Sequence, residues 1–263
     1  MLYKETGFTL GGLHSRDDMG LIYVEKEGHI VIPEIKRNTY SIAGVSGQVL
    51  FPGETWQPFN LEGTLYPARE PKTQAEAQRL IRRVTAWLTA GRNPLIFDYE
   101  PEVFYLVELS AATKWSLRNW FGGEIQIRWT AQPYAYAVTP DTASAEITGT
   151  SCQLQLRVRT RHPAPLILTI ENTGGAPITR VDVGSGVSLR ELYMMPDQVM
   201  TITMEPPIGA VIDGESALSK AVAFDPVLLD AGDHTVSVHL TYDSDAPGAP
   251  AGAKISASVR GRW

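Results

Sequence analysis

Apolar residues recur with a helical period in one segment of the chain, residues 72–90. Leu80, Ile81, Val84, Trp87 and Leu88 stand at positions i, i+1, i+4, i+7 and i+8. This spacing places all five side chains on one face of a helix. The pattern therefore predicts an amphipathic helix with a single apolar stripe.

Both ends of this segment carry helix-boundary signals. Pro71 precedes it, and Thr73 and Glu76 have capping-box spacing, in which each side chain satisfies a backbone donor of the other residue. Gly91 follows it and can adopt the left-handed conformation that ends many helices. The helix prediction thus rests on the period and on two caps.

The rest of the first half alternates between apolar and polar residues, as half-buried strands do. In residues 124–130, Ile125, Ile127 and Trp129 alternate with polar neighbours, and we expect this strand to end at Pro133. The other predicted strands are 20–24, 29–33, 40–43, 59–66, 95–99 and 103–110. One helix among many strands predicts an α+β domain, a β-sandwich or barrel whose one face the helix covers.

The chain changes character after Tyr136. Residues 137–150 are small and polar, which is typical of a connection, so we predict two domains, 1–137 and 138–263. No helical period follows, and short strands recur at 152–159, 166–172, 179–183, 187–192, 198–204, 210–213, 227–230, 234–242 and 254–260. This spacing predicts an all-β antiparallel sandwich or jelly roll.

Two loops stand apart from these strands. Residues 44–53 contain two glycine-bearing turns around a short apolar core and predict a projecting hairpin or arm. Residues 243–252 join two late strands with proline, glycine and alanine, and we expect an exposed loop there.

Charge and composition narrow the function. The net charge of −6 divides into −1 up to Ala137, from 14 basic and 15 acidic residues, and −5 beyond it, from 9 and 14. A nucleic-acid binder usually carries a basic stripe, so specific nucleic-acid binding is not expected. The chain begins without the apolar stretch of a secretory signal, and no run approaches the roughly 18 apolar residues of a membrane span. We therefore expect a soluble protein made in the cytoplasm, with no membrane insertion.

One group of residues has the types that nucleophilic catalysis uses. His14, Ser15, Asp17 and Asp18 stand close together in a glycine-rich polar stretch. The stretch reads more simply as a solvated turn between strands, and the chain has no GxSxG elbow. We therefore assign no catalytic residue.

The candidate metal ligands do not converge in sequence. His234 and His239 share a predicted strand at an odd spacing, which places them on opposite faces. Asp243 and Asp245 lack the DxDxDG pattern of a calcium loop. Cys152 is the single cysteine and is expected to pack at a strand edge. We assign no metal site.

Three further features have structural explanations. The loops 44–47 and 184–186 lack the glycine-lysine pattern and the following helix of a phosphate site, so we expect turns and no cofactor. Glu100 and Glu102 flank a proline in a turn, with nothing to mark an acid/base pair. The aromatic cluster Trp115, Trp120 and Phe121 is expected to pack in a core or a subunit contact.

The order of motifs in the first half resembles a known family. The loop beginning at Gly44, the capped helix before Gly91, the segment 95–106 and a strand that closes on Pro133-Tyr134-Ala135-Tyr136 follow one another. In this order they resemble the N-terminal domain of the distal tail protein (Dit) family of long-tailed phages.

The second half fits the same resemblance. That family has a β-sandwich, often galectin-like, after the boundary. The matching motifs here are 171–175 (ENTGG), 212–214 (IDG), 231–236 (AGDHTV) and the end of the chain, 260–263 (RGRW).

The resemblance implies a structural protein and no reaction. It implies a homo-hexameric ring, made by the first domain, that joins the tail tube protein to the tail-tip, tail-associated and receptor-binding proteins. The implied location is the tail tip or baseplate of the virion, after assembly in the cytoplasm of the bacterial host. The acidic balance also suits a channel that DNA crosses without binding.

Two other functions stay open at the sequence level. The second domain could be a carbohydrate-binding module that recognises the host surface, although Tyr193, Phe224, Tyr242 and Trp263 are its only aromatic residues. The chain could also be a small hydrolase that uses His14, Asp17 and Asp18. The first alternative can coexist with a hub role.

Overall fold

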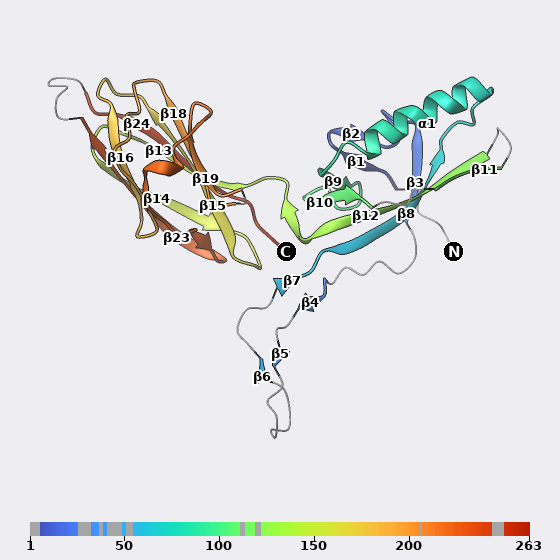
Figure 1. Cartoon of the computed structure of the whole chain (residues 1–263), viewed down its shortest axis with the longest axis horizontal. Helices are drawn as coiled ribbons and strands as arrows, with labels where there is room; N and C mark the ends of the chain where they lie inside the picture. Colours follow the sequence, from blue (N-terminus) through green and yellow to red (C-terminus); the bar gives the residue numbers. More distant parts are fainter. Residues whose placement is uncertain are drawn as a thin grey trace. The chain divides into compact units, whose positions relative to one another are not determined.

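The computed structural model describes residues 6–25, 33–36, 39–40, 49–50, 55–110, 114–118, 122–205, 207–243 and 250–263. Within these residues the chain is mostly β-strand, with one α-helix (Figure 1). The chain divides into two compact units, residues 1–138 and 139–263. Each unit has its own hydrophobic core.

The first unit is built on one antiparallel eight-stranded sheet. Its strand order is β2-β1-β9-β10-β12-β8-β3, and β11 also pairs with β12. An isolated bridge joins Thr6 to Tyr23 of β3, so that the segment before β1 meets the strand at the far end of the order. The strands are β1 (Phe8–Leu10), β2 (Leu13–His14), β3 (Leu21–Glu25), β8 (Phe59–Pro67), β9 (Asn93–Phe97), β10 (Val103–Leu109), β11 (Lys114–Arg118) and β12 (Gly122–Ala137).

The predicted helix is present as α1 (Gln74–Leu88). Thr73 is its N-cap, and its Oγ1 accepts a hydrogen bond from the Glu76 N–H at 3.2 Å. The Glu76 carboxylate reaches one residue further back than a capping box requires and accepts from the Lys72 N–H at 2.8 Å. Gly91 has a φ of 91°, the left-handed conformation expected after the helix.

The apolar stripe of α1 completes an aromatic core. Val84, Trp87 and Leu88 are buried, and the Trp87 indole N–H donates to the Leu10 carbonyl at 3.0 Å. The Trp87 ring stacks on Phe8 at 5.5 Å between centroids. Phe8 also meets the edges of Tyr23 and Trp129, each at 5.2 Å. Large rings thus fill the space between the sheet and a single helix.

Strand β12 runs further than the sequence predicts. The expected end at Pro133 is wrong, because the strand continues to Ala137. Val107 pairs with Ala131 and Tyr105 with Ala135, so Leu106 alone faces the three residues 132–134, which form a bulge. On its other side β12 pairs with β8 only up to Ala131. A proline lacks a donor and is tolerated at a bulge beside an open edge, which explains how the strand passes through Pro133.

Four short strands are described in the chain between β3 and β8. The ladder of β4 (Ile35–Lys36) with β7 (Thr55–Trp56) and that of β5 (Thr39–Tyr40) with β6 (Val49–Leu50) are both antiparallel. Most of the predicted strands 29–33 and 40–43 lies outside the described residues, as does most of the predicted hairpin 44–53. Those predictions stay untested.

The second unit consists of two antiparallel sheets. One has the order β13-β24-β15-β18-β19-β20, with β22 also paired to β15, and the other has the order β14-β23-β16-β17-β21. A short 3-10 helix, η1 (Leu218–Lys220), precedes β21. The strands are β13 (Asp141–Ile147), β14 (Ser151–Val158), β15 (Ala164–Asn172), β16 (Ile178–Val183), β17 (Val187–Leu189), β18 (Val199–Thr203), β19 (Gly209–Ile212), β20 (Glu215–Ser216), β21 (Ala221–Phe224), β22 (Leu228–Leu229), β23 (Gly232–Tyr242) and β24 (Ala253–Val259).

Aliphatic side chains from both sheets form one core. Along β15, Leu166, Leu168 and Ile170 are fully buried, and Val238 and Leu240 of β23 belong to the same cluster from the other sheet. Inward-facing residues at every second position are what two packed sheets require. The second unit is therefore a β-sandwich.

The first strand of this sandwich lies in the segment predicted to be a linker. That prediction is wrong for Asp141–Ile147, which form β13 and pair with β24 over seven residues. Ala143, Ala145 and Ile147 pack against the core at alternate positions. Two of these three core residues are alanine, so the alternation carries little hydrophobic signal.

One motif that carried the family resemblance, the ENTGG stretch, has a structural role in this unit. Asn172 of the ENTGG stretch is fully buried, and its amide donates to the carbonyls of Ala176 and Met194, both at 3.0 Å. Its Oδ1 accepts from the Gly174 N–H at 3.2 Å. A side chain on Gly174 would lie 2.5 Å from the backbone of residues 250 and 252. The motif therefore joins two loops where only glycine fits.

Candidate functional site

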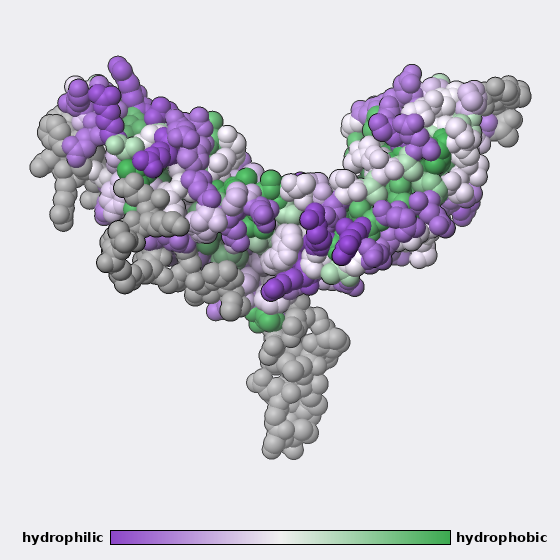
Figure 2. All heavy atoms as spheres, turned by 180° about the vertical axis from the view of Figure 1, so that it is seen from behind, coloured by the Kyte–Doolittle hydropathy of each residue, from purple (hydrophilic) through white to green (hydrophobic). Residues whose placement is uncertain are grey.

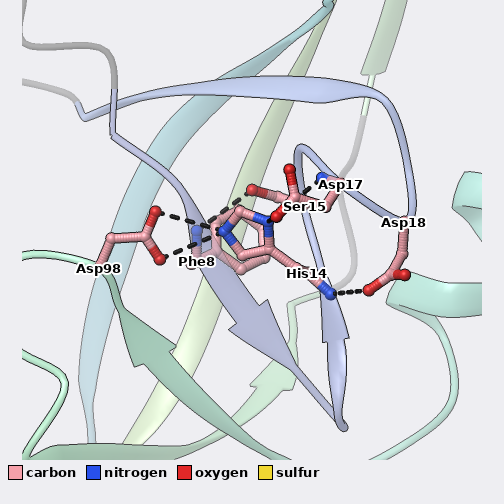
Figure 3. Close-up of polar contacts among 6 residues, drawn as sticks. All are labelled: Phe8, His14, Ser15, Asp17, Asp18 and Asp98. Atoms are coloured by element: carbon pink, nitrogen blue, oxygen red, sulfur yellow. Dashed lines mark hydrogen bonds and ion pairs between the residues drawn. The ribbon is translucent and has the colours of Figure 1, made fainter.

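In the first unit, the residues that were weighed as a catalytic group form a turn whose side chains hydrogen-bond to its own backbone (Figure 3). The His14 N–H donates to the Asp18 carboxylate at 2.7 Å, and the Asp17 N–H donates to His14 Nδ1 at 3.2 Å. In neutral His14 the proton therefore sits on Nε2, which lies 3.3 Å from both carboxylate oxygens of Asp98. In charged His14, Nδ1 would instead face the Asp17 carboxylate, which is 3.1 Å away.

Ser15 does not complete a catalytic group with this histidine. Its side chain is fully buried, and its Oγ accepts the Phe8 N–H at 3.1 Å (Figure 3). A nucleophile needs a hydrogen bond to its base and an approach for the substrate. Ser15 has neither among the described contacts. The cluster fixes the connection between β2 and β3, which is the turn between strands that the sequence predicts.

Gly7 is part of the same arrangement. A Cβ atom on Gly7 would collide with the Asp98 carboxylate and would lie 2.7 Å from His14 Nε2. The Asp98 N–H also donates to the Gly7 carbonyl at 3.1 Å. The close approach of Asp98 and His14 thus depends on a glycine at this position.

The other titratable candidates are hydrogen-bonded to a neighbour, partly buried, or both. Tyr105 donates its hydroxyl to Glu100 at 3.1 Å, and burial together with this carboxylate raises the pKa of Tyr105. Burial and the neighbouring Glu25 raise the pKa of Tyr99 in the same way. Burial also raises the pKa of Cys152, which favours the unreactive thiol.

The histidines of β23 lie on opposite faces, as their spacing predicts. His234 shares the face of the buried Val236 and Val238, whereas His239 lies on the exposed face. Within the described part of the chain no group of three or more His, Cys, Asp or Glu residues could hold a metal ion. Asp245, Trp120 and Phe121 lie outside the described residues, and Trp115 is placed only by its pairing with Ile125.

Sequence reasoning did not find a groove in the second unit. It has a volume of about 470 Å³ and lies where residues 191–193 and Gln198 meet the β19–β20 hairpin and η1. The apolar residues that line it are Leu192, Ile212, Ala217 and Tyr193, and the polar ones include Glu191, Gln198, Asp213, Glu215 and Lys220. Tyr193 is 64% exposed. Small exposed apolar areas are also visible among hydrophilic side chains on both units in Figure 2.

The backbone around the groove contains every positive-φ non-glycine residue of the described chain. These residues are Glu191 (52°), Asp197 (64°) and Asp213 (46°). Asp213 and Gly214 form the two-residue loop between Ile212 and Glu215, which is a type I′ turn. Asp197 follows Pro196 in a turn that the Gln198 N–H closes on the Met195 carbonyl at 3.3 Å. Two of the three conformations are therefore ordinary turn geometry.

The left-handed backbone conformation of Glu191 has a different origin. The sequence predicts a strand to residue 192, but β17 ends at Leu189. On one side the Arg190 N–H donates to the Lys220 carbonyl at 2.9 Å, and on the other the Leu192 N–H donates to the Thr179 carbonyl at 3.0 Å. Anchoring to two different neighbours turns the chain out of the strand and holds Glu191 in the left-handed region.

A curved sheet covered by one helix and followed by a β-sandwich is the fold of a phage distal tail protein. A solved structure with this fold is SPP1 Dit (gp 19.1), described as a paradigm of the hub adsorption apparatus in phages that infect Gram-positive bacteria. It matches with a TM-score of 0.64 and 14% sequence identity, over 98% of this chain and 99% of that chain.

No protein-family model and no curated protein matches the sequence. At 14% identity the structural likeness shows the fold. The resemblance that the order of motifs predicted is thereby confirmed at the level of the fold.

No helix of the described chain is both long and apolar enough to cross a bilayer.

Proposed function

We propose that this protein is a structural hub protein of a phage tail tip or baseplate. In this proposal six copies form a ring that joins the tail tube to the tail-tip and receptor-binding proteins. The observation that carries the proposal is the fold, which follows SPP1 Dit over 98% of the chain and across both units. A match confined to one unit would point only to a common β-sandwich.

The geometry of the His14 cluster supports a non-enzymatic role. A hydrolase that used His14, Asp17 and Asp18 would need a nucleophile or a water bound at the imidazole. Here the imidazole is held between the Asp17 N–H and the Asp98 carboxylate. The residues that resemble a catalytic group therefore serve the turn.

The first unit offers surfaces suited to a ring. A ring of identical subunits needs two different patches that fit each other. In the described residues β11 pairs only with β12, so one edge of β11 is open. Leu13 on the terminal strand β2 is 44% exposed. An open strand edge is a ready template for pairing with another chain.

The second unit would then be the docking unit. Its sequence carries most of the net negative charge, −5 of −6. The first unit, which would form the ring, has a net charge of −1 over residues 1–137, so it offers DNA no basic surface to bind as it passes through the ring. A galectin-like fold for this sandwich is part of the same proposal.

A pair of matched substitutions tests which unit forms the ring. Leu13→Glu places a charge on the first unit, and Leu228→Glu places one on the second, where Leu228 is 52% exposed. Sedimentation velocity at equal concentrations should show that Leu13→Glu shifts the protein to smaller species, because burying an unpaired charge is costly. Leu228→Glu should assemble like the unsubstituted protein. The opposite pattern would assign ring formation to the second unit and contradict the proposal.

A further inference from the structure

We propose that the groove lined by Glu191, Tyr193, Gln198, Asp213, Glu215 and Lys220 binds a short neutral saccharide. This inference does not rest on ring formation. It concerns a site on the second unit that the hub role leaves unused.

The first argument is the exposed aromatic ring. Tyr193 is 64% exposed, between the buried Leu192 and the fully buried Met194. Leaving a tyrosine ring in water forgoes the stabilisation that its burial would give. Pyranose rings have an apolar C–H face that stacks on aromatic rings, and ligand sites combine such surfaces with a few placed polar groups. The ring and the apolar lining of Leu192, Ile212 and Ala217 supply the surface.

The second argument is the supply of donors and acceptors. Gln198 Oε1 accepts the Met195 N–H at 2.7 Å, which orients its amide and leaves the NH₂ group to donate. Asp213 Oδ1 accepts the Val199 N–H at 3.0 Å, which leaves Oδ2 to accept. Lys220 adds donors, and Glu191 and Glu215 add acceptors. Each sugar hydroxyl both donates and accepts, so a mixed set of this kind suits a polyol.

The third argument is the conformation of Glu191. A left-handed backbone conformation is strained for a non-glycine residue, and such residues gather at functional sites. Asp197 and Asp213 are explained by their turns, whereas Glu191 is held only by hydrogen bonds of its two neighbours. This geometry sets the exposed Glu191 side chain at the groove beside Tyr193.

The charges of the groove select among ligands. Three carboxylates, of Glu191, Asp213 and Glu215, stand against one ammonium, of Lys220. A polyanion such as a glycerol phosphate polymer would be repelled. A basic peptide would be attracted by the carboxylates and by the Tyr193 ring, but its charges would meet Lys220 and would not use the Gln198 and Lys220 donors, so tetralysine serves as the competing ligand in the test. A neutral saccharide carries no charge, and its hydroxyls can hydrogen-bond to the carboxylates as well as to the ammonium.

The test uses the full chain and ligand-observed NMR. The probes are glucose, galactose, N-acetylglucosamine and rhamnose, each as a monosaccharide and as a disaccharide, with poly(glycerol phosphate) and tetralysine as charged alternatives. We expect saturation transfer to at least one neutral saccharide. Tyr193→Ala should weaken that binding by about tenfold or more, because the stacking surface is lost.

Three control variants make the result specific. Tyr193→Phe keeps the ring and should retain most of the affinity. Leu228→Ala removes an exposed apolar side chain outside the groove and should leave binding unchanged. Glu191→Gly should weaken binding while the melting temperature stays equal or rises, because glycine adopts the left-handed conformation without strain.

Three results would overturn the proposal. These are silence with every neutral saccharide, equal binding by the Tyr193→Ala variant, and preferential binding of poly(glycerol phosphate) or tetralysine. None of them bears on ring formation, so failure here is distinguishable from failure of the hub proposal.

Discussion

The two units fill their cores in different ways. In the first, Phe8, Tyr23, Phe97, Trp87 and Trp129 pack within one cluster between a single sheet and one helix. In the second, the buried residues of the core cluster are all aliphatic or methionine.

The difference follows from the layers. Two packed sheets lie about 10 Å apart and interdigitate small branched side chains from both faces. In the first unit one helix covers the sheet, and large rings of tryptophan, tyrosine and phenylalanine supply much of the buried surface. The first core therefore depends on a few large residues, and the second on many equivalent ones.

The largest expected effect comes from removing one ring of the first core. Trp129 is 1% exposed, and its ring meets Phe8 edge-on at 5.2 Å. Trp129→Ala should lower the free energy of unfolding of the first unit by about 3–5 kcal/mol. Urea unfolding followed by circular dichroism should show the loss in one of two transitions.

The matched change in the second unit is Leu168→Ala. Leu168 is fully buried in the aliphatic core, and its truncation should cost about 2–5 kcal/mol in the other transition. Five of the six tryptophans lie in the first unit, so intrinsic fluorescence identifies its transition. If either substitution shifted both transitions equally, the two cores would not be independent.

A smaller effect on stability is expected at two glycines, of which one faces backbone atoms and the other faces side chains. Gly174→Ala places a Cβ 2.5 Å from the Gly252 nitrogen and the Pro250 carbonyl oxygen, which cannot easily move, so we expect a loss of about 2 kcal/mol or more. Gly7→Ala meets the end of the Asp98 side chain, which is 48% exposed and can turn away. Its cost should stay near 1 kcal/mol. Thermal melts of the two variants test the order, and an inverted order would contradict these close contacts.

The smallest expected effect concerns pH. Partial burial by itself would raise the pKa of Asp182, but the hydrogen bond and the charge of Arg180, together with the neighbouring Ser188 hydroxyl, hold it below its ordinary value. The Arg180 Nε lies 2.7 Å from the Asp182 carboxylate. A lowered folded-state pKa stabilises the protein above the ordinary aspartate range, and this contribution is lost as the pH falls through the folded-state pKa.

The measurement is the stability of the Asp182→Asn variant against pH. At pH 7 the variant should be less stable by about 1 kcal/mol, and the difference should shrink below about pH 4. The β16–β17 pairing joins Asp182 to Ser188, so the change should appear in the second transition. A difference that stayed constant with pH would show that Asp182 does not act through its charge.

Much of the fold was readable where side chains alternate strongly. The caps of α1 and the strands β8, β10, β15 and β23 agree with the predicted segments to within a few residues. The alternation failed where core positions are small, as Ala143 and Ala145 show in β13. It also failed at Pro133, because only the paired neighbours reveal that the strand passes through a bulge there.

The candidate sites were likewise predictable only where they depend on local sequence. The turn around His14 and the separation of His234 from His239 follow from local spacing, and both are present. The groove could not be predicted, because Glu191 is placed by hydrogen bonds of its neighbours to residues 179 and 220, far away in sequence. The turn signals at Pro196-Asp197 and Asp213-Gly214 were available, but nothing local shows that they meet Tyr193.

Native mass spectrometry of the purified full chain, with negative-stain images of the same sample, tests the central claim most directly. One chain has a mass of 28.8 kDa. The hub proposal predicts a species of six chains and ring-shaped particles with six-fold symmetry. The share of this species should increase with protein concentration. A protein that stays a single chain at the highest concentration reached, with no ring in the images, would contradict it.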